Sequence, residues 1–108
     1  MIIVYLSGKM TGLAESEYKE KFRIAEMFYR ACGYEVVNPC DLSEIVLKRK
    51  PDANYEDFMA EDLRALRSCT HIALLEGWEN SPGAKKEKEE AEGSGLAIMF
   101  YRIPGGKE

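Results

Sequence analysis

The sequence of 108 residues has few of the side chains on which many enzymes depend. It holds one histidine and three cysteines, and no two cysteines stand in Cys-x-x-Cys spacing. Nucleophilic catalysis assisted by histidine, zinc sites with two histidine ligands and a disulfide framework are therefore disfavoured. We interpret Cys32, Cys40 and Cys69 as packing residues and His71 as a residue that lines a strand, and we expect no metal site.

Positive charge and long apolar runs are also scarce. The chain has 15 Lys and Arg against 19 Asp and Glu, whereas proteins that bind nucleic acid carry a clustered basic excess. No apolar run approaches the roughly 20 residues that cross a bilayer, and Met1 leads directly into apolar residues. We expect one cytoplasmic domain over residues 1–108, with a frayed tail at 103–108 and with no nucleic-acid polymer or membrane as partner.

Hydrophobic periodicity predicts strands that alternate with helices. The predicted strands are 2–6, 34–37, 71–75 and 96–101. The predicted helices are 14–32, 55–68 and 82–93, while residues 41–53 show no clear period and suit a short helix plus a loop. This order predicts an α/β protein, a flavodoxin-like or Rossmann-like three-layer sandwich whose parallel sheet of four to five strands carries helices on both faces.

Ligands of such sheets bind beyond the carboxyl ends of the strands, here at 7–12, 38–41 and 76–83. The glycine-rich turn 7–12 offers backbone N–H groups, a hydroxyl and a lysine near a helix start, which suits an anion. It matches neither a Walker loop nor a dinucleotide motif, so a plain strand-to-helix turn is the alternative. Ser81 and Gly83, at the start of a later helix, form a second candidate anion site.

The charged run 85–90 contains one carboxylate on the small-residue face of its helix. With Ser81 as the N-cap, Glu87 shares a face with Ala84 and Ala91. This placement predicts that Glu87 faces the sheet. The alternative is that the whole run is a solvated face, as charge runs usually are.

Asp62 shows the same anomaly on the preceding helix, because it lies one turn from Phe58 within an apolar stripe. An edge position for Asp62, with Leu63 facing the core, is the alternative. A buried carboxylate without partners is costly, so two of them on consecutive helices suggest that Asp62 and Glu87 share a cleft. Such a pair suits glycosidic bond cleavage, in which one carboxylate attacks the anomeric carbon and the other manages a proton.

Three segments together resemble one family: VYLSGKMTG at 4–12, EDL at 61–63 and GWENSPGAKKEKEEA at 77–91. They resemble the nucleoside 2-deoxyribosyltransferase superfamily, and within it a small uncharacterised phage and bacterial branch. The most specific part is the pattern G-[AST]-x-x-E-x-x-x-A at 83–91. The resemblance extends from the first predicted strand to the fourth.

The resemblance implies that Glu87 is a nucleophile that attacks C1′ of a deoxyribose. It also implies that Asp62 gives a proton to the departing base and that Tyr5 orients the nucleophile. Ser81 resembles the serine at this position in relatives that hydrolyse 2′-deoxynucleoside 5′-monophosphates. We therefore expect cleavage of the N-glycosidic bond of a nucleoside or, preferred, its 5′-monophosphate, by hydrolysis or base transfer and without a cofactor.

The expected substrate-binding residues are Ser7, Gly8, Lys9, Met10, Gly12, Trp78, Ser81 and Gly83, with Tyr55 and Trp78 beside the base. The resemblance further implies a homodimer or larger homo-oligomer in which a second chain closes the site. One alternative is a catalytically inactive nucleotide-binding or regulatory module of the same fold. A flavin carrier is another, since the fold class also suits FMN.

Overall fold

The structure, a computed structural model, describes residues 1–102, so the frayed tail expected at 103–108 lies outside the described residues. Its centre is a four-stranded parallel sheet in the order β2-β1-β3-β4. The strands are β1 (Ile3–Ser7), β2 (Glu35–Val37), β3 (His71–Leu75) and β4 (Ala97–Tyr101). This order places β1 and β3, the two most deeply buried strands, in the middle of the sheet, where parallel strands are covered on both faces.

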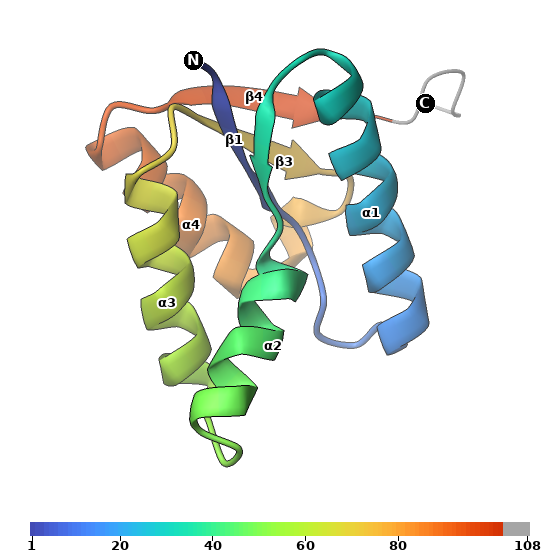
Figure 1. Cartoon of the computed structure of the whole chain (residues 1–108), viewed down its shortest axis with the longest axis vertical. Coiled ribbons are helices and arrows are strands. Elements are labelled where there is room, and N and C mark those ends of the chain that lie inside the picture. Colours follow the sequence, from blue (N-terminus) through green and yellow to red (C-terminus); the bar gives the residue numbers. More distant parts are fainter. Residues whose placement is uncertain (103–108) are drawn as a thin grey trace.

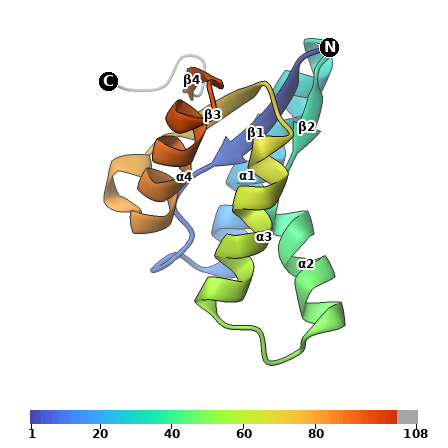
Figure 2. The same ribbon diagram turned by 90° about the vertical axis from the view of Figure 1, so that its left-hand side faces the viewer.

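The helices are α1 (Glu15–Ala31), α2 (Pro39–Arg49), α3 (Tyr55–Arg67) and α4 (Pro82–Gly93), and a 3₁₀ turn, η1 (Trp78–Asn80), precedes α4. Helix α1 covers one face of the sheet, and α3 and α4 cover the other (Figures 1 and 2). Helix α2 lies beyond the carboxyl ends of β1 and β2, between α1 and α3 in the view of Figure 1. The predicted α/β sandwich with helices on both faces is therefore confirmed, with four strands.

Side chains of β1 alternate between two separate cores. Val4 and Leu6 pack beneath α1, whereas Tyr5 packs on the other face with Leu66 of α3 and Ala91 of α4. Ser7, two residues after Tyr5, projects to the same face as Tyr5. Strand β1 thus delivers two hydroxyl groups to the side of the sheet on which α3 and α4 lie.

Two details differ from the sequence-based expectations. Cys40 and Cys69 are buried as expected, but Cys32 is exposed, because it is the C-cap of α1 and lies past the last turn that packs on the sheet. The short helix expected within 41–53 is present as α2, but it begins two residues earlier, at Pro39.

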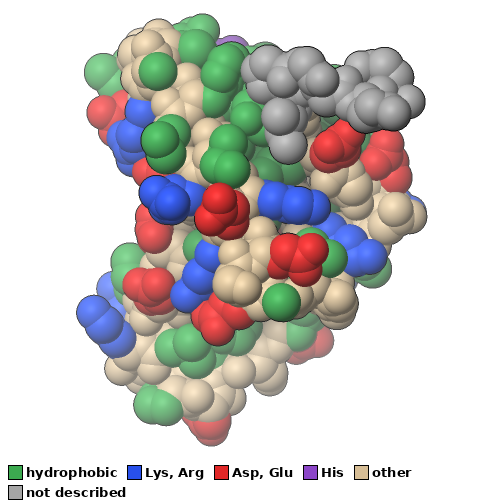
Figure 3. Space-filling model, turned by 90° about the vertical axis from the view of Figure 1, so that its right-hand side faces the viewer, with side chains coloured by type: hydrophobic (Ala, Val, Ile, Leu, Met, Phe, Trp, Pro, Cys, Tyr) green, Lys and Arg blue, Asp and Glu red, His purple; other side chains and the backbone are tan. Residues whose placement is uncertain are grey.

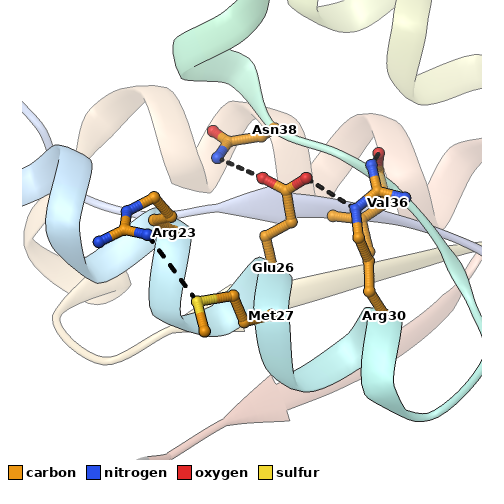
Figure 4. Close-up of polar contacts among 6 residues, drawn as sticks. All are labelled: Arg23, Glu26, Met27, Arg30, Val36 and Asn38. Carbon is orange, nitrogen blue, oxygen red and sulfur yellow. Dashed lines mark hydrogen bonds and ion pairs between the residues drawn. The ribbon is translucent and has the colours of Figure 1, made fainter.

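Helix α2 begins at Pro39 because the Asn38 side chain caps it, accepting a hydrogen bond from the Cys40 backbone N–H at 2.9 Å. Figure 4 shows how α1 fixes the orientation of this amide. The Asn38 Nδ2 group donates to Oε1 of Glu26 at 3.1 Å, and Nε of Arg30 donates to Oε2 of Glu26 at 2.8 Å. Glu26 therefore ties α1 to the first turn of α2.

The outer face of α1 meets water. Figure 3 shows acidic, basic and hydrophobic side chains interspersed on this side of the molecule. Ile24, Met27 and Phe28 are among the exposed hydrophobic residues of α1, while Phe22, Ala25 and Tyr29 are buried on its inner face. None of the helices in residues 1–102 combines the length and the apolar character that a membrane span requires.

Candidate active site

Glu87 lies on the buried face of α4, with 6% of its surface exposed. The hydroxyl of Ser81 caps α4 by accepting a hydrogen bond from the Ala84 backbone N–H at 3.1 Å, and this cap sets the rotation of the helix. Ala84 and Ala91, three residues before and four residues after Glu87, are buried on the same face. The alternative of a wholly solvated charged run is therefore wrong for Glu87.

Two hydroxyl groups from β1 hold the Glu87 carboxylate. The Tyr5 hydroxyl donates to Oε2 at 2.8 Å, and the Ser7 hydroxyl donates to Oε1 at 2.6 Å. Both donors are buried, with no exposed surface. Because each oxygen has its own donor, the plane of the carboxylate is fixed as well as its position.

Asp62 of α3 is the third partner of Glu87. Burial, the nearby charge of Glu87 and a hydrogen bond to Glu87 together raise the pKa of Asp62 to about 8. At neutral pH Asp62 therefore carries a proton, and its carboxylic O–H donates to Glu87. The predicted convergence of the two carboxylates is confirmed.

Burial also raises the pKa of Glu87, and the hydrogen bonds from Ser7, Tyr5 and Asp62 only partly oppose that rise. The pKa of Tyr5 is raised well above its usual value, first by burial and then by the Glu87 charge, so Tyr5 remains a neutral donor. No salt bridge among the described residues involves Glu87 or Asp62. The pKa values of both carboxyl groups are thus raised, with no salt-bridged cation among the described residues to oppose the effect of burial.

A cavity of about 620 Å³ opens onto this carboxylate pair at the carboxyl edge of the sheet. Its walls come from the loop after β1 and from α1, α2, α3 and α4. Most of the wall is apolar; it includes Met10, Tyr18, Phe22, Pro39, Leu47, Phe58 and Met59. This volume lies within the range of small-molecule sites, and an apolar wall around a few polar groups is typical of them.

The cavity collects some of the expected substrate-binding residues and leaves others outside. Gly8, Met10, Ser81 and Gly83 line it, as does Tyr55. Ser7 contacts Glu87 and is not part of the cavity lining. Gly12 lies outside the lining, Lys9 lines a separate small cavity with Glu76 and Gly77, and the Trp78 ring packs near Phe100 with centroids 6.1 Å apart.

Two of these glycines let neighbouring elements approach closely. A Cβ at Gly83 would lie 3.3 Å from the Met59 side chain and 3.4 Å from the Tyr55 hydroxyl, both on α3. A Cβ at Gly8 would lie 3.1 Å from Cβ of Leu75 at the end of β3. Both contacts are tighter than ordinary packing, so glycine allows α3 and the first loop to close around the carboxylates.

Two lysines on the cavity wall were not predicted as site residues. Lys19 of α1 pairs with Glu15 at 2.8 Å and Glu44 at 3.8 Å. Lys86, in the first turns of α4, lies 5.8 Å above the Tyr55 ring. In sequence Lys86 is hidden within a run of charges, and only its position one residue before Glu87 could have indicated its place.

Within residues 1–102 no group of three or more His, Cys, Asp or Glu side chains could hold a metal ion. A buried carboxylate with a free lone pair can attack an electrophilic carbon, and a protonated carboxylic acid beside it can deliver a proton to a leaving group.

The fold and site define an α/β protein with a parallel sheet and a buried Glu–Asp pair under a ligand-sized cavity at the carboxyl ends of its strands. Residues 2–100 match the family described as a domain of unknown function, DUF4406. The chain belongs to this family. A search of the curated proteins and a search of the solved structures found no match.

Proposed function

We propose that the protein cleaves the N-glycosidic bond of a nucleoside or, preferred, of a deoxynucleoside 5′-monophosphate, with Glu87 as the nucleophile. One observation carries the proposal: a buried carboxylate, oriented by two hydroxyls, stands beside a carboxylic acid whose pKa is about 8. Burial raises the pKa of both carboxyl groups, but their mutual hydrogen bond raises the pKa of Asp62 and lowers that of Glu87. Such a difference between two carboxyl groups is the usual basis for dividing nucleophile and acid roles in glycosidic cleavage. The resemblance to nucleoside 2-deoxyribosyltransferases supports the same division.

In the first step Glu87 attacks C1′ of the sugar. The C1′–N bond breaks and its electron pair moves to the base nitrogen, while Asp62 gives its proton to the base. An ester between Glu87 and the sugar remains, and Asp62 is left as a carboxylate. The raised pKa of Asp62 suits this step, because the acid is still protonated at neutral pH.

In the second step water attacks C1′ of the ester and Asp62 takes up a proton from that water. The bond between C1′ and the Glu87 oxygen breaks, and the free sugar leaves with Glu87 restored as a carboxylate. A second base in place of water would give base transfer instead. Asp62 therefore acts as an acid and then as a base, and ends each cycle protonated.

The preference for a 5′-monophosphate rests on the first turn of α4. Ser81, Gly83 and Lys86 all line the cavity there, and a helix N-terminus favours a negative group. Unlike Lys19, Lys86 takes no part in a salt bridge among residues 1–102. Lys9, which the sequence suggested as an anion ligand, lines a different cavity and has no part in this proposal.

As part of the proposal we expect the protein to act in the cytoplasm on a small molecule, as a homodimer or larger homo-oligomer. The resemblance implies that a second chain closes the site. Sedimentation of the protein with and without a deoxynucleoside monophosphate measures this association. A monomer under conditions of full activity would contradict it.

The test measures by chromatography the free base that is released from deoxynucleosides, deoxynucleoside 5′-monophosphates and ribonucleoside 5′-monophosphates. We expect the wild-type protein to release base fastest from the deoxynucleoside monophosphates, and Glu87→Gln to release none above background. The matched control is Glu89→Gln, because Glu89 is an exposed glutamate on the same helix. Base release that survives Glu87→Gln, or nucleotide binding without turnover in the wild type, would refute the proposal; the second result would favour a nucleotide-binding module.

A further inference from the structure

The two oxygens of Glu87 are held by different residues of one strand. Tyr5 and Ser7 stand two residues apart in β1, so their side chains project to the same face of the sheet. Tyr5 donates to Oε2 at 2.8 Å and Ser7 donates to Oε1 at 2.6 Å. The last torsion of a glutamate side chain is broad, so a carboxylate with one donor can still rotate, whereas two donors on separate oxygens fix its plane.

Ser7 is placed to act on Glu87 and not on a ligand. Its side chain has no exposed surface, and it is not part of the cavity lining. Its hydroxyl makes one side-chain hydrogen bond among the described residues, the bond to Glu87. A buried hydroxyl on an otherwise apolar strand costs desolvation, and here its partner is the buried carboxylate.

We infer that Ser7 is a positioning residue, which fixes the plane of the Glu87 carboxylate for attack and keeps that carboxylate ionised. This inference rests on the proposed function for its kinetic consequence. A hydrogen bond to an ionised acceptor is stronger than one to a neutral acceptor, so the Ser7 hydroxyl favours the charged form of Glu87. Fixing the plane also brings the attacking lone pair closer to its productive direction before substrate binds.

Other groups that face Glu87 set the background for this effect. Tyr5 on β1 and Asp62 on α3 are the titratable groups that act directly on the Glu87 carboxylate, and Asp62 titrates with it as a coupled pair. On the opposite cavity wall, Lys19 on α1 is paired with Glu15 and Glu44. Loss of the Ser7 hydroxyl leaves all of these groups in place, so a change in Glu87 titration reports on Ser7.

The test compares wild-type protein with Ser7→Ala, Ser7→Cys and Ser68→Ala. Cysteine keeps a weak donor of similar size, and Ser68 is a matched control because its hydroxyl bonds to the Ala65 carbonyl of its own helix. Carboxyl carbon NMR of protein labelled at glutamate follows the Glu87 titration directly, with Glu87→Gln identifying the signal. Base release from deoxynucleoside monophosphates is measured over the same pH range.

We expect Ser7→Ala to raise the Glu87 pKa by about one unit, equivalent to about tenfold tighter proton binding. The acidic limb of kcat/KM moves up with it, and a loss of about tenfold in kcat persists at pH values where Glu87 is fully ionised, since a charged hydrogen bond is worth that much or more. Ser7→Cys falls between wild type and Ser7→Ala, and Ser68→Ala matches wild type.

A Ser7→Ala protein whose Glu87 titration and pH profile match the wild type would overturn the inference, even if the variant were less stable. That outcome leaves the proposed function intact, because base release by the wild type is measured in the same series. Absence of base release by wild-type protein would overturn the proposed function, and with it the role of Ser7 in attack.

Discussion

Glu26 and Glu87 both lie on the inner sides of their helices, and hydrogen bonds hold both carboxylate oxygens of each residue. The pKa values of the two side chains nevertheless shift in opposite directions. Glu26 accepts from Asn38 and Arg30, and Glu87 accepts from Ser7 and Tyr5. Burial raises the pKa of Glu26, but the hydrogen bonds from Arg30 and Asn38 and the Arg30 charge outweigh burial and leave that pKa below its usual value.

Glu87 lacks the cation. Its donors are neutral and its third neighbour, Asp62, is itself an acid, so burial dominates and the pKa of Glu87 is raised. Glu87 accepts more hydrogen bonds than Glu26 and still has the raised pKa, so the direction of the shift follows the charge of the donors and not their number. A charge kept without a counterion in a cavity wall costs stability and retains reactivity, which is the usual mark of a functional site.

The largest effect that separates the two glutamates is on activity. We expect Glu87→Gln to reduce base release by at least about a thousandfold, because the amide cannot form the ester, while Glu26→Gln retains activity within about threefold. Initial rates at saturating deoxynucleoside monophosphate measure both. Equal losses in the two variants would show that the two carboxylates do not differ in role.

The next effect concerns the proton that Asp62 supplies. Asp62→Asn keeps a donor to Glu87 but has no proton to transfer, so kcat falls by about 10²–10⁴-fold. With a deoxyribosyl substrate whose leaving group departs without protonation, the rate of the first burst of leaving-group release should fall far less, since the first step no longer needs the acid. The ratio of the two rates measures this, and a uniform loss for both substrates would argue against an acid role.

The free energy of unfolding should change with pH in opposite directions for variants at Asp62 and at Glu26. Asp62 has a folded pKa of about 8, above its unfolded value of about 3.9, so the stability that its proton contributes is lost as the pH rises from about 4 to about 8. Asp62→Asn removes this titration, and its stability relative to wild type should therefore increase across that window. Urea unfolding from pH 4 to pH 9 measures the difference.

Glu26 gives the reverse slope. Its folded pKa is lowered, so its stabilisation is present above its unfolded pKa of about 4.3 and is lost as the pH falls through the lower folded pKa. Glu26→Gln should cost about 0.5–1 kcal/mol at pH 7, because its partner Arg30 is half exposed, and nothing at the acid end of that titration. If the unfolding free energies of Asp62→Asn and Glu26→Gln, each taken relative to wild type, changed with pH in the same direction, the contrast would be refuted.

A further effect on stability lies at the cap that Glu26 orients. Asn38→Ala removes the acceptor for the Cys40 N–H at the start of α2, and the free energy of unfolding should fall by about 1 kcal/mol. Asn38→Asp keeps the acceptor but loses the donor to Glu26 and adds a second charge beside it, so it should restore little of this stability. Thermal unfolding of the two variants measures the difference; a fully restored stability in Asn38→Asp would contradict the coupling to Glu26.

Most of the fold could be predicted from the sequence, because each element carries its own periodicity. The strand His71–Leu75 and the helix Pro82–Gly93 occur with their predicted bounds. Helix α2 was poorly predicted because its apolar spacing is weak, and its start depends on a cap that Glu26 orients across the chain. The local signal for this start is Asn38 followed by proline at the first helical position.

The carboxylate pair was also predictable, because small residues one turn away from Glu87 mark the face that packs on the sheet. The partner of Ser7 was not predicted. Ser7 follows an apolar run and precedes glycine, so it resembles a loop residue, although its spacing of two from Tyr5 indicates the same face of β1. Trp78 and Lys9 were misplaced, because sequence adjacency to a loop does not say into which cavity a side chain points.

The most direct test of the central claim is to trap the ester on Glu87. In Asp62→Asn, a deoxyribosyl 5′-phosphate substrate with a leaving group that needs no proton should form the ester readily, while hydrolysis of that ester is slow because no base activates water. After acid quenching, peptide mass spectrometry should find one deoxyribose phosphate on the peptide that carries Glu87. Release of the leaving group with no adduct, or an adduct on another residue, would contradict the account.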